Sequence, residues 1–278
     1  MDNIGSEPSR AHARVAVSGL CFPGLTAVES VGVLGEMGVT KTSLTSAKLR
    51  ESGVDAVLRA CGTHRVDVVT TTAIARFDLS SGADVSAQVQ HAREDIDQAA
   101  AAGAASAYTI TGPRAYPDWS ANVTAYARLV ADVRDYAAER GLRLAVEPTN
   151  WLYADLNFVH SFHDAVAFAA RTGLGVCLDL FHVFGEASLR EDIGKHVDLI
   201  SHVQVSDLER GARSLPCRAV PGDGDLPLRD VVKWLLDAGY DGPFDLELSG
   251  PAIDAIGHRQ AAERSVAWLD RLLTDLGA

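Results

Sequence analysis

The chain has 278 residues, enough for one large domain or two of ordinary size. Its formal net charge of −12 disfavours binding to a nucleic-acid backbone, which requires a basic surface. No apolar run reaches the roughly 18 residues that a membrane helix needs, residues 1–14 contain no signal-peptide core, and the four cysteines form no CxxC pair. We therefore expect a cytoplasmic protein with reduced cysteines and with neither a nucleic-acid nor a membrane partner.

Short apolar runs typical of strands alternate along the chain with longer segments whose apolar residues recur at helical spacing. Eight strands are predicted, at residues 15–18, 39–44, 66–70, 107–110, 142–146, 175–178, 200–205 and 244–248. Helices between them include residues 85–102, 121–140, 163–171 and 228–238, and glycines at 141 and 173 mark the ends of two of them. This alternation predicts one (β/α)8 TIM barrel over residues 14–278, preceded by a mobile N-terminal tail at residues 1–13. The alternative, an open doubly wound sheet, is less favoured because residues 19–24 lack a glycine-rich dinucleotide turn.

Four of the predicted strands carry a metal-capable oxygen side chain at or near their ends, namely Glu147, Asp179, Gln204 and Glu247. The C-terminal ends of parallel barrel strands converge on one mouth. Three carboxylates gathered there would repel one another unless a cation lay between them. We therefore predict one divalent metal site formed by these four residues. Its oxygen donors favour Mn²⁺ or Mg²⁺ over Zn²⁺, with Co²⁺ as an acceptable substitute.

Two histidines and a lysine are further candidates. His182 follows Asp179 by three residues, and we interpret it as a partner of a substrate oxygen in preference to a ligand or a packed residue. His202 shares a strand face with Gln204 because side chains alternate along a strand. It is either a partner of the ligands or a packed core residue. Lys41 lies in the second strand and either pairs with an anionic substrate or is an ordinary solvated lysine.

The order Glu, Asp, Gln, Glu on strands five to eight resembles the xylose-isomerase-like sugar isomerase/epimerase superfamily of TIM barrels, and the resemblance covers nearly the whole chain after the tail. Residues 202–207, His-Val-Gln-Val-Ser-Asp, with Arg210 and then Pro-Gly-Asp-Gly at residues 221–224, are most similar to hydroxypyruvate isomerases. The resemblance implies that Glu147 and Glu247 act as the acid/base pair and that His182 and Arg210 contact substrate oxygens. It also implies that the metal ligands are Glu147, Asp179, Gln204 and Glu247.

The activity implied is that of a metal-dependent isomerase or epimerase. One glutamate removes a proton beside the carbonyl of a hydroxy-ketone, and the other glutamate returns a proton, through a metal-stabilised enediolate. The implied substrate is a small polyhydroxy ketone or a keto-glycoside. The resemblance also implies a homodimer or a homotetramer.

The chain departs from the ketose epimerases at two places. After Glu147-Pro-Thr-Asn, Trp151 and Tyr153 replace an arginine and an acidic residue, and the second strand does not end in the acidic residue that many relatives carry there. The substrate is therefore left open. Three alternatives remain: a lyase that uses the same enolisation (a dehydratase or a keto-glycoside eliminase), an apurinic-site endonuclease, which the acidic charge disfavours, and a non-catalytic binding barrel.

Overall fold

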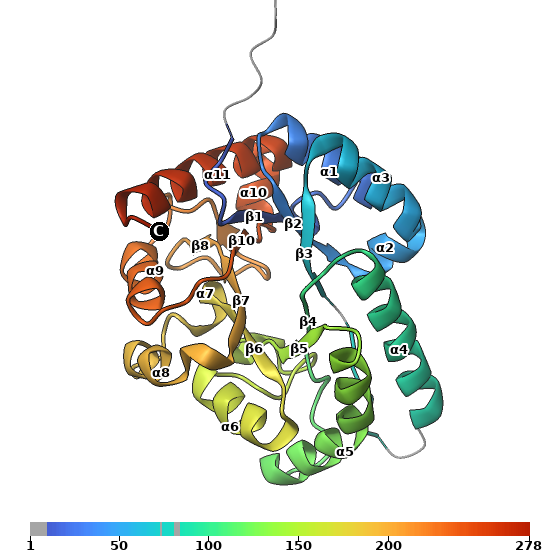
Figure 1. The fold of residues 1–278 in the computed structure, drawn as a ribbon. Helices are drawn as coiled ribbons and strands as arrows, with labels where there is room; N and C mark the ends of the chain where they lie inside the picture. Colours follow the sequence, from blue (N-terminus) through green and yellow to red (C-terminus); the bar gives the residue numbers. More distant parts are fainter. Residues whose placement is uncertain (1–9, 73, 81–83) are drawn as a thin grey trace, which may run out of the picture.

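The structure, a computed structural model, describes residues 10–72, 74–80 and 84–278 (Figure 1). Eight parallel strands close into a barrel in the order β1–β10–β7–β6–β5–β4–β3–β2, and helices surround it. This confirms the single (β/α)8 TIM barrel. The barrel strands are β1 (Val15–Ser18), β2 (Lys41–Thr45), β3 (Asp67–Thr72), β4 (Ser106–Thr109), β5 (Arg143–Val146), β6 (Gly175–Asp179), β7 (Ile200–Val205) and β10 (Phe244–Leu246).

The outer layer is helical. Its α-helices are α1 (Ala27–Glu36), α2 (Ser46–Ser52), α3 (Val54–His64), α4 (Val85–Ala101), α5 (Trp119–Ala138), α6 (Phe162–Thr172), α7 (Leu180–Val183), α8 (Leu189–His196), α9 (Leu228–Asp237), α10 (Pro251–Ile256) and α11 (His258–Asp275). Short 3₁₀ turns occur at η1 (Gly19–Cys21), η2 (Trp151–Tyr153) and η3 (Val197–Leu199). No helix in the described part of the chain is both long enough and apolar enough to cross a membrane.

Side-chain caps set where several of these helices begin. Thr26 and Glu29 form a reciprocal capping box at the start of α1, and Asp118 and Ser161 accept bonds from the first turns of α5 and α6. Gly173 ends α6 in the left-handed conformation, with φ of 72°, as its position in the sequence predicted. Local chemistry therefore fixes the helix boundaries that bring each strand back into the barrel.

The barrel has two distinct buried regions. The main apolar core lies between the strands and the helices, whereas Tyr108, Ala145 and Cys177 form a separate small cluster. Side chains alternate along a strand, so Cys177 shares a strand face with Asp179, and His202 shares one with Gln204. Tyr108 stacks on His202 and bonds to Gln204, which places this small cluster directly beside the buried polar residues.

Several sequence expectations need correction in detail. Lys41 is the first residue of β2, and its ammonium group bonds to the carbonyl of Ala13. It therefore lies at the N-terminal end of the barrel, away from the mouth, and the second strand begins two residues later than predicted. The small hairpin of β8 (Asp207–Leu208) and β9 (Arg218–Ala219), an antiparallel pair after β7, was not predicted.

Most of the expected tail lies outside the described residues, which begin at residue 10. The part that is described packs on the barrel. The backbone N–H of Ala11 donates to Gly38 O at 3.1 Å, and that of His12 donates to Asp270 Oδ1 at 2.6 Å. The chain is thus bound to α11 already at His12.

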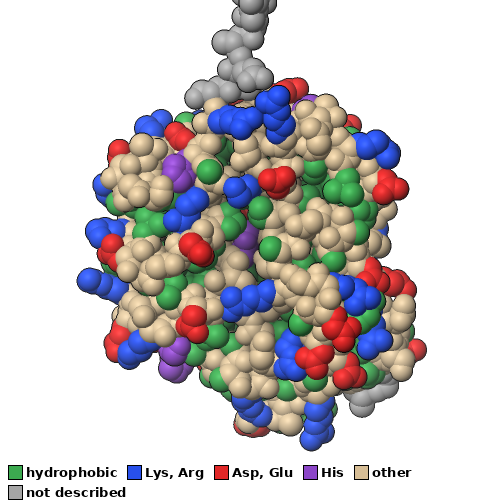
Figure 2. Space-filling model, viewed as in Figure 1, with side chains coloured by type: hydrophobic (Ala, Val, Ile, Leu, Met, Phe, Trp, Pro, Cys, Tyr) green, Lys and Arg blue, Asp and Glu red, His purple; other side chains and the backbone are tan. Residues whose placement is uncertain are grey.

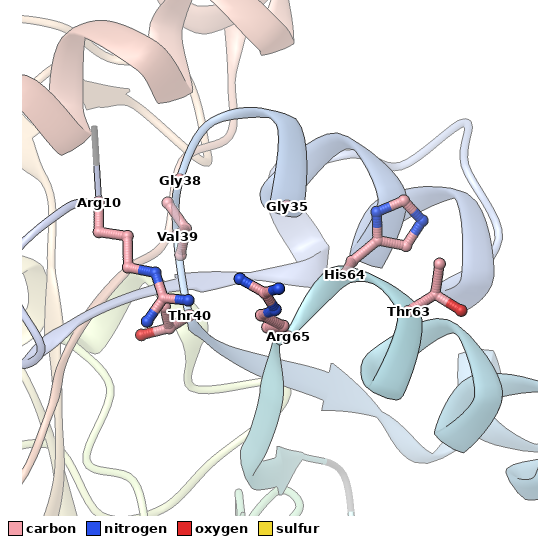
Figure 3. A pocket seen from close by; sticks show the side chains of 8 residues that line it. All are labelled: Arg10, Gly35, Gly38, Val39, Thr40, Thr63, His64 and Arg65. Atoms are coloured by element: carbon pink, nitrogen blue, oxygen red, sulfur yellow. The ribbon is translucent and has the colours of Figure 1, made fainter. Parts of the chain in front are cut away.

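The surface shown in Figure 2 carries acidic and basic side chains interspersed with one another, with no single-sign field across that face. One hollow of about 250 Å³ lies beside the start of β2, where Arg10 and Arg65 point toward one another (Figure 3). A larger one of about 630 Å³ is lined by the first residues of β3, β4, β5 and β7. Neither hollow is lined by Glu147, Asp179 or Glu247, so both are separate from the predicted site.

Candidate metal centre

Glu147, Asp179 and His182 converge at the C-terminal ends of β5 and β6. Glu147 directly follows β5, and Asp179 is the last residue of β6. Asp179 also caps α7 by accepting a bond from Phe181 N, so the chain turns at once and brings His182 back over the strand end. One ligand atom from each of the three residues lies within 4.8 Å of the others. The geometry therefore brings together two predicted ligands and one predicted substrate contact.

Glu247 follows the strand β10 and is connected to Asp179 by an arginine, Arg218, which the sequence analysis did not identify. Arg218 Nη2 donates to Asp179 Oδ2 at 2.6 Å and to Glu247 Oε1 at 2.8 Å. Its Nη1 donates to Asp179 Oδ1 at 3.2 Å and to Ser206 Oγ at 3.0 Å. The guanidinium group also lies over the ring of Phe181, 4.5 Å from its centre, and Arg218 is only 4% exposed. The site thus contains a buried guanidinium as well as buried carboxylates.

Asp207 fixes the hairpin that carries Arg218. Its carboxylate accepts backbone bonds from Leu208, Gly222 and Leu226, so the Pro-Gly-Asp-Gly segment at residues 221–224 wraps around it. A Cβ at Gly224 would collide with this carboxylate, and Gly222 has φ of 90°, a conformation that favours glycine. The motif noted in the sequence therefore has a structural role: it anchors the hairpin. That motif follows Arg218 by three residues and was the only available signal for it.

Gln204 is fully buried at the same level, but its amide oxygen is directed away from the carboxylates. Its Nε2 donates to Tyr108 Oη at 2.9 Å and to Glu247 Oε2, and its Oε1 accepts from the Cys177 thiol at 3.1 Å. In this orientation Gln204 holds Glu247 in place. Ligation through its oxygen requires a rotation of the amide that exchanges oxygen and nitrogen.

His182 is held in one tautomer. The backbone N–H of Asn150 points at its Nδ1 at 3.3 Å, so Nδ1 is the acceptor and the proton of the neutral ring lies on Nε2. Nε2 lies 3.6 Å from Asp179 Oδ2 and 3.8 Å from Glu147 Oε1. A ligand needs a lone pair on that nitrogen. The arrangement therefore favours His182 as a hydrogen-bond donor over His182 as a ligand.

His202 lies beside the site, against Asp245 and Tyr108. Its Nε2 lies 3.0 Å from Asp245 Oδ2, and its ring stacks on Tyr108, whose hydroxyl accepts the bond from Gln204. His202 also lines the larger hollow near the strand starts. It is thus connected to the candidate ligands through Tyr108 and Gln204.

Burial dominates the electrostatics of the site. Burial raises the pKa of Glu147 well above its usual value, and the charges of Glu247 and Asp179 raise it further. Burial also raises the pKa of Glu247 to about 7, although Arg218 opposes this. The pKa of Asp179 moves the other way: burial would raise it, but the charges of Arg218 and His182 hold it below its ordinary value. Burial lowers the pKa of His182 to about 4, so its contact with Asp179 at neutral pH is not an ion pair.

Two predicted substrate contacts are not brought to this place. Arg210 is exposed on the loop between β8 and β9, where its backbone N–H donates to Asp225. Lys41 lies at the other end of the barrel. Among the aromatic residues near the mouth, Trp151 is 67% exposed on η2 and stacks on His160, with ring centres 4.2 Å apart.

The residues present fit a hard divalent cation. Glu147 and Asp179 are buried, and the side chain of Glu247 is 12% exposed; one guanidinium cannot neutralise these three carboxylates when all are ionised. Among the described residues, no hydrogen-bond donor is recorded within bonding distance of the Glu147 side-chain oxygens, whose nearest basic neighbour is His182 Nε2 at 3.8 Å. Oxygen donors of this kind suit Mg²⁺, Mn²⁺ or a similar ion.

Comparison with protein families matches residues 24–272 to the xylose isomerase-like TIM barrel. The chain belongs to this family. The match begins between β1 and α1 and ends within α11, and it confirms the resemblance that the order of residues on β5, β6, β7 and β10 indicated.

Two curated proteins share parts of the chain. It is 32% identical over 156 residues to the 3-dehydroshikimate dehydratase of Pseudomonas putida, which covers 51% of this chain and 24% of that protein. It is 38% identical over 80 residues to a protein of Streptomyces coelicolor provisionally named a hydroxypyruvate isomerase, which covers 27% of this chain and 26% of that protein. The chain thus matches only about a quarter of the length of each.

Solved structures share the whole fold. A structure of the IolI protein with a bound zinc atom has a TM-score of 0.81 at 14% identity and covers 94% of this chain and 98% of that one. An L-ribulose 3-epimerase has a TM-score of 0.79 at 16% identity and covers 96% of both chains. At these identities the likeness establishes the barrel fold and nothing finer.

Proposed function

We propose that this chain is a divalent-metal-dependent isomerase or epimerase that moves a proton beside the carbonyl of a hydroxy-ketone, such as a sugar or a sugar-like compound. The observation that carries the proposal is a pair of glutamates with raised pKa at one barrel mouth beside Asp179: Glu147, which is buried, and Glu247, whose side chain is 12% exposed. Carboxyl groups with pKa values raised toward neutrality are suited to take up and release protons near pH 7.

The proposed ligands are Glu147, Asp179 and Glu247, with the amide oxygen of Gln204 as a fourth after rotation of the amide. A divalent cation held there supplies a Lewis acid that favours loss of a proton from the carbon next to a carbonyl. Manganese or magnesium is the proposed ion, with cobalt as a substitute, because the donors are oxygens.

The remaining steps belong to residues of the chain. One of Glu147 and Glu247 removes the proton from carbon, and the other delivers a proton to the opposite face or to the neighbouring carbon. The Nε2–H of His182 donates to a substrate oxygen, because Asn150 holds the other ring nitrogen as an acceptor. The low exposure of Glu147 and Asp179 limits the access of water to the reacting atoms and strengthens these interactions.

A lyase is the second candidate. The same enolisation expels a leaving group on the adjacent carbon, and the match to the 3-dehydroshikimate dehydratase over 51% of the chain favours this reading. The dehydratase outcome differs from isomerisation only in the fate of the carbanion. The two readings therefore share residues and metal but differ in product mass.

The proposal is tested by incubating the protein with Mn²⁺ in D₂O and a panel of ketoses, hydroxypyruvate, 3-keto-glycosides and 3-dehydroshikimate. We expect at least one compound to gain solvent deuterium on carbon, as read by NMR and mass spectrometry. A product of unchanged formula apart from deuterium supports an isomerase or epimerase, and loss of water or of an aglycone supports a lyase.

Matched variants assign the chemistry to the glutamates. Glu147→Gln and Glu247→Gln keep the side-chain volume but remove proton transfer, so deuterium uptake should fall by about 100-fold or more in each. Glu186→Gln, a glutamate that bonds to backbone N–H groups at the start of α6, should leave uptake unchanged. Exchange that persists in both site variants would exclude the proposed acid/base pair.

A further inference from the structure

Arg218 is the residue whose position the proposed function does not explain. Its Nη2 lies 2.6 Å from Asp179 Oδ2 and 2.8 Å from Glu247 Oε1, and it therefore sits between two of the proposed ligands. Divalent Mg²⁺ or Mn²⁺ bound to both of those oxygens lies about 2.0–2.2 Å from each. The atom Nη2 and such an ion would therefore compete for the same two oxygens.

We propose that Arg218 is a built-in counter-cation that exchanges with the metal: without metal its guanidinium bridges Asp179 and Glu247, and a divalent ion binds both carboxylates only as the guanidinium leaves that bridge. This inference rests on the proposed metal site. It adds to that site a competitor that belongs to the chain itself and that sets how tightly the ion is held.

The bonds of Arg218 explain why the bridge is stable before metal enters. The guanidinium contacts the buried Asp179, the largely buried carboxylate of Glu247, the Ser206 hydroxyl and the face of Phe181. Without that charge the buried carboxylates would repel one another and would be protonated or displaced. Arg218 therefore keeps two ligands in place while the metal is absent.

Like charges explain why the bridge opens. A divalent ion and a guanidinium that share the same carboxylate oxygens in a site excluded from water repel each other strongly. Arg218 is carried by β9, which pairs only with the two-residue strand β8, and residues 209–215 between them are exposed. Residues 209–215 can thus give way as the guanidinium leaves the bridge, while Asp207 keeps the base of the hairpin anchored and the barrel strands stay unchanged.

A metal titration tests the exchange without relying on activity. Mn²⁺ affinity is measured calorimetrically for the wild type, Arg218→Met, Arg218→Lys and the control Arg213→Met, which removes an exposed arginine of the same loop. If Arg218 must leave the bridge, Arg218→Met should bind Mn²⁺ more tightly, by about tenfold or more, the scale on which groups around a metal alter its affinity. Arg218→Lys should fall between, and Arg213→Met should equal the wild type.

Other outcomes are equally informative. Weaker binding by Arg218→Met would overturn the exchange, because it would show that Arg218 supports the ligands while the metal is bound. An unchanged affinity would overturn it as well, and Arg218→Lys equal to the wild type would show that charge alone, not the bridge, matters. A wild type that binds no Mn²⁺ contradicts the proposed function itself, so the two failures are distinguishable.

Hydrogen exchange of the wild type covers the case in which Arg218→Met does not fold. Saturating Mn²⁺ should speed amide exchange in residues 207–219, which hold the hairpin, and slow it at the ends of β5 and β6. Slower exchange in the hairpin on addition of Mn²⁺ would show that the metal tightens the bridge and would overturn the proposal.

Discussion

Gln204 is buried with its amide nitrogen toward Glu247 and its amide oxygen toward Cys177. The residue type and strand position predicted a ligand. The sequence could not show the direction of the amide, because that depends on Tyr108 and Cys177, which come from the strands β4 and β6. Gln204 can position Glu247 or ligate a metal, and these two roles predict different effects of a substitution on stability and on metal affinity.

Gln204→Leu keeps the volume and removes both roles. Loss of the bonds to Tyr108 and Glu247 should destabilise the metal-free protein by about 1–3 kcal/mol. If the amide oxygen also ligates, Mn²⁺ affinity should fall by about 10- to 100-fold. Melting temperature followed during a Mn²⁺ titration gives both quantities. A lower stability with unchanged Mn²⁺ affinity would assign Gln204 to positioning alone.

His182 makes the stability of the metal-free protein depend on pH. Burial lowers its pKa from 6.5 to about 4, so between these values the unfolded chain binds a proton that the folded chain does not. Stability should therefore fall as pH decreases from 6.5 to 4, by roughly 3 kcal/mol in total from this residue. Urea unfolding across that range, compared with His182→Gln, measures the effect.

The comparison with the variant is necessary because Glu247 acts in the opposite direction. Its pKa is raised to about 7, so its contribution is lost as pH rises toward 7. The difference between the wild type and His182→Gln isolates the histidine. His163→Gln, at a side chain that is 77% exposed, should behave as the wild type. Equal pH slopes for the wild type and His182→Gln would contradict the neutral, buried imidazole.

The sequence motif did not identify which arginine lies in the site. Arg210 was chosen because it follows the His-Val-Gln segment, yet it is exposed, and the guanidinium in the site belongs to Arg218. Both precede the Pro-Gly-Asp-Gly segment. Which of them turns inward is decided by the pairing of β8 with β9, and strands of two residues leave no periodicity to detect.

Elements were predicted best where their pattern is long. Helix α4 was expected at residues 85–102 and spans Val85–Ala101, and β7 was expected and found at residues 200–205. The second strand was expected at residues 39–44 and spans Lys41–Thr45. Its run of small and polar residues does not mark clearly where the strand begins. Lys41, expected to be either a partner of an anionic substrate or a solvated lysine, is the first residue of β2.

The hairpin β8–β9 should depend on Asp207. Asp207→Ala removes three backbone bonds, to Leu208, Gly222 and Leu226, and should destabilise the protein by about 2–4 kcal/mol. It should also free the hairpin, so that trypsin cleaves faster at Arg210 and Arg213. Mass spectrometry of the fragments locates the cuts.

A control in the same segment separates this anchor from a general charge effect. Asp223→Ala removes an exposed carboxylate that pairs with Arg264, and it should change stability by less than about 1 kcal/mol. Equal losses in Asp207→Ala and Asp223→Ala would show that the buried carboxylate does not anchor the hairpin.

At the scale of the whole molecule, the barrel was predictable because eight strand patterns with intervening helices admit few other arrangements. The closed strand order confirms it. The boundary of the tail at residue 13 stays a prediction, as does a homodimer or homotetramer. Limited proteolysis should remove only residues before Ala11, because Ala11 and His12 are bonded to the barrel. Two stable halves of similar size would contradict a single cooperative barrel.

The central claim is that the mouth binds one divalent metal through its buried carboxylates, and metal stoichiometry tests it most directly. Equilibrium dialysis against Mn²⁺, followed by elemental analysis, should give one ion per chain for the wild type. Asp179→Asn, which keeps the side-chain volume, should give none while still melting cooperatively. A wild type without bound metal, or an Asp179→Asn variant that keeps a full equivalent, would contradict the account.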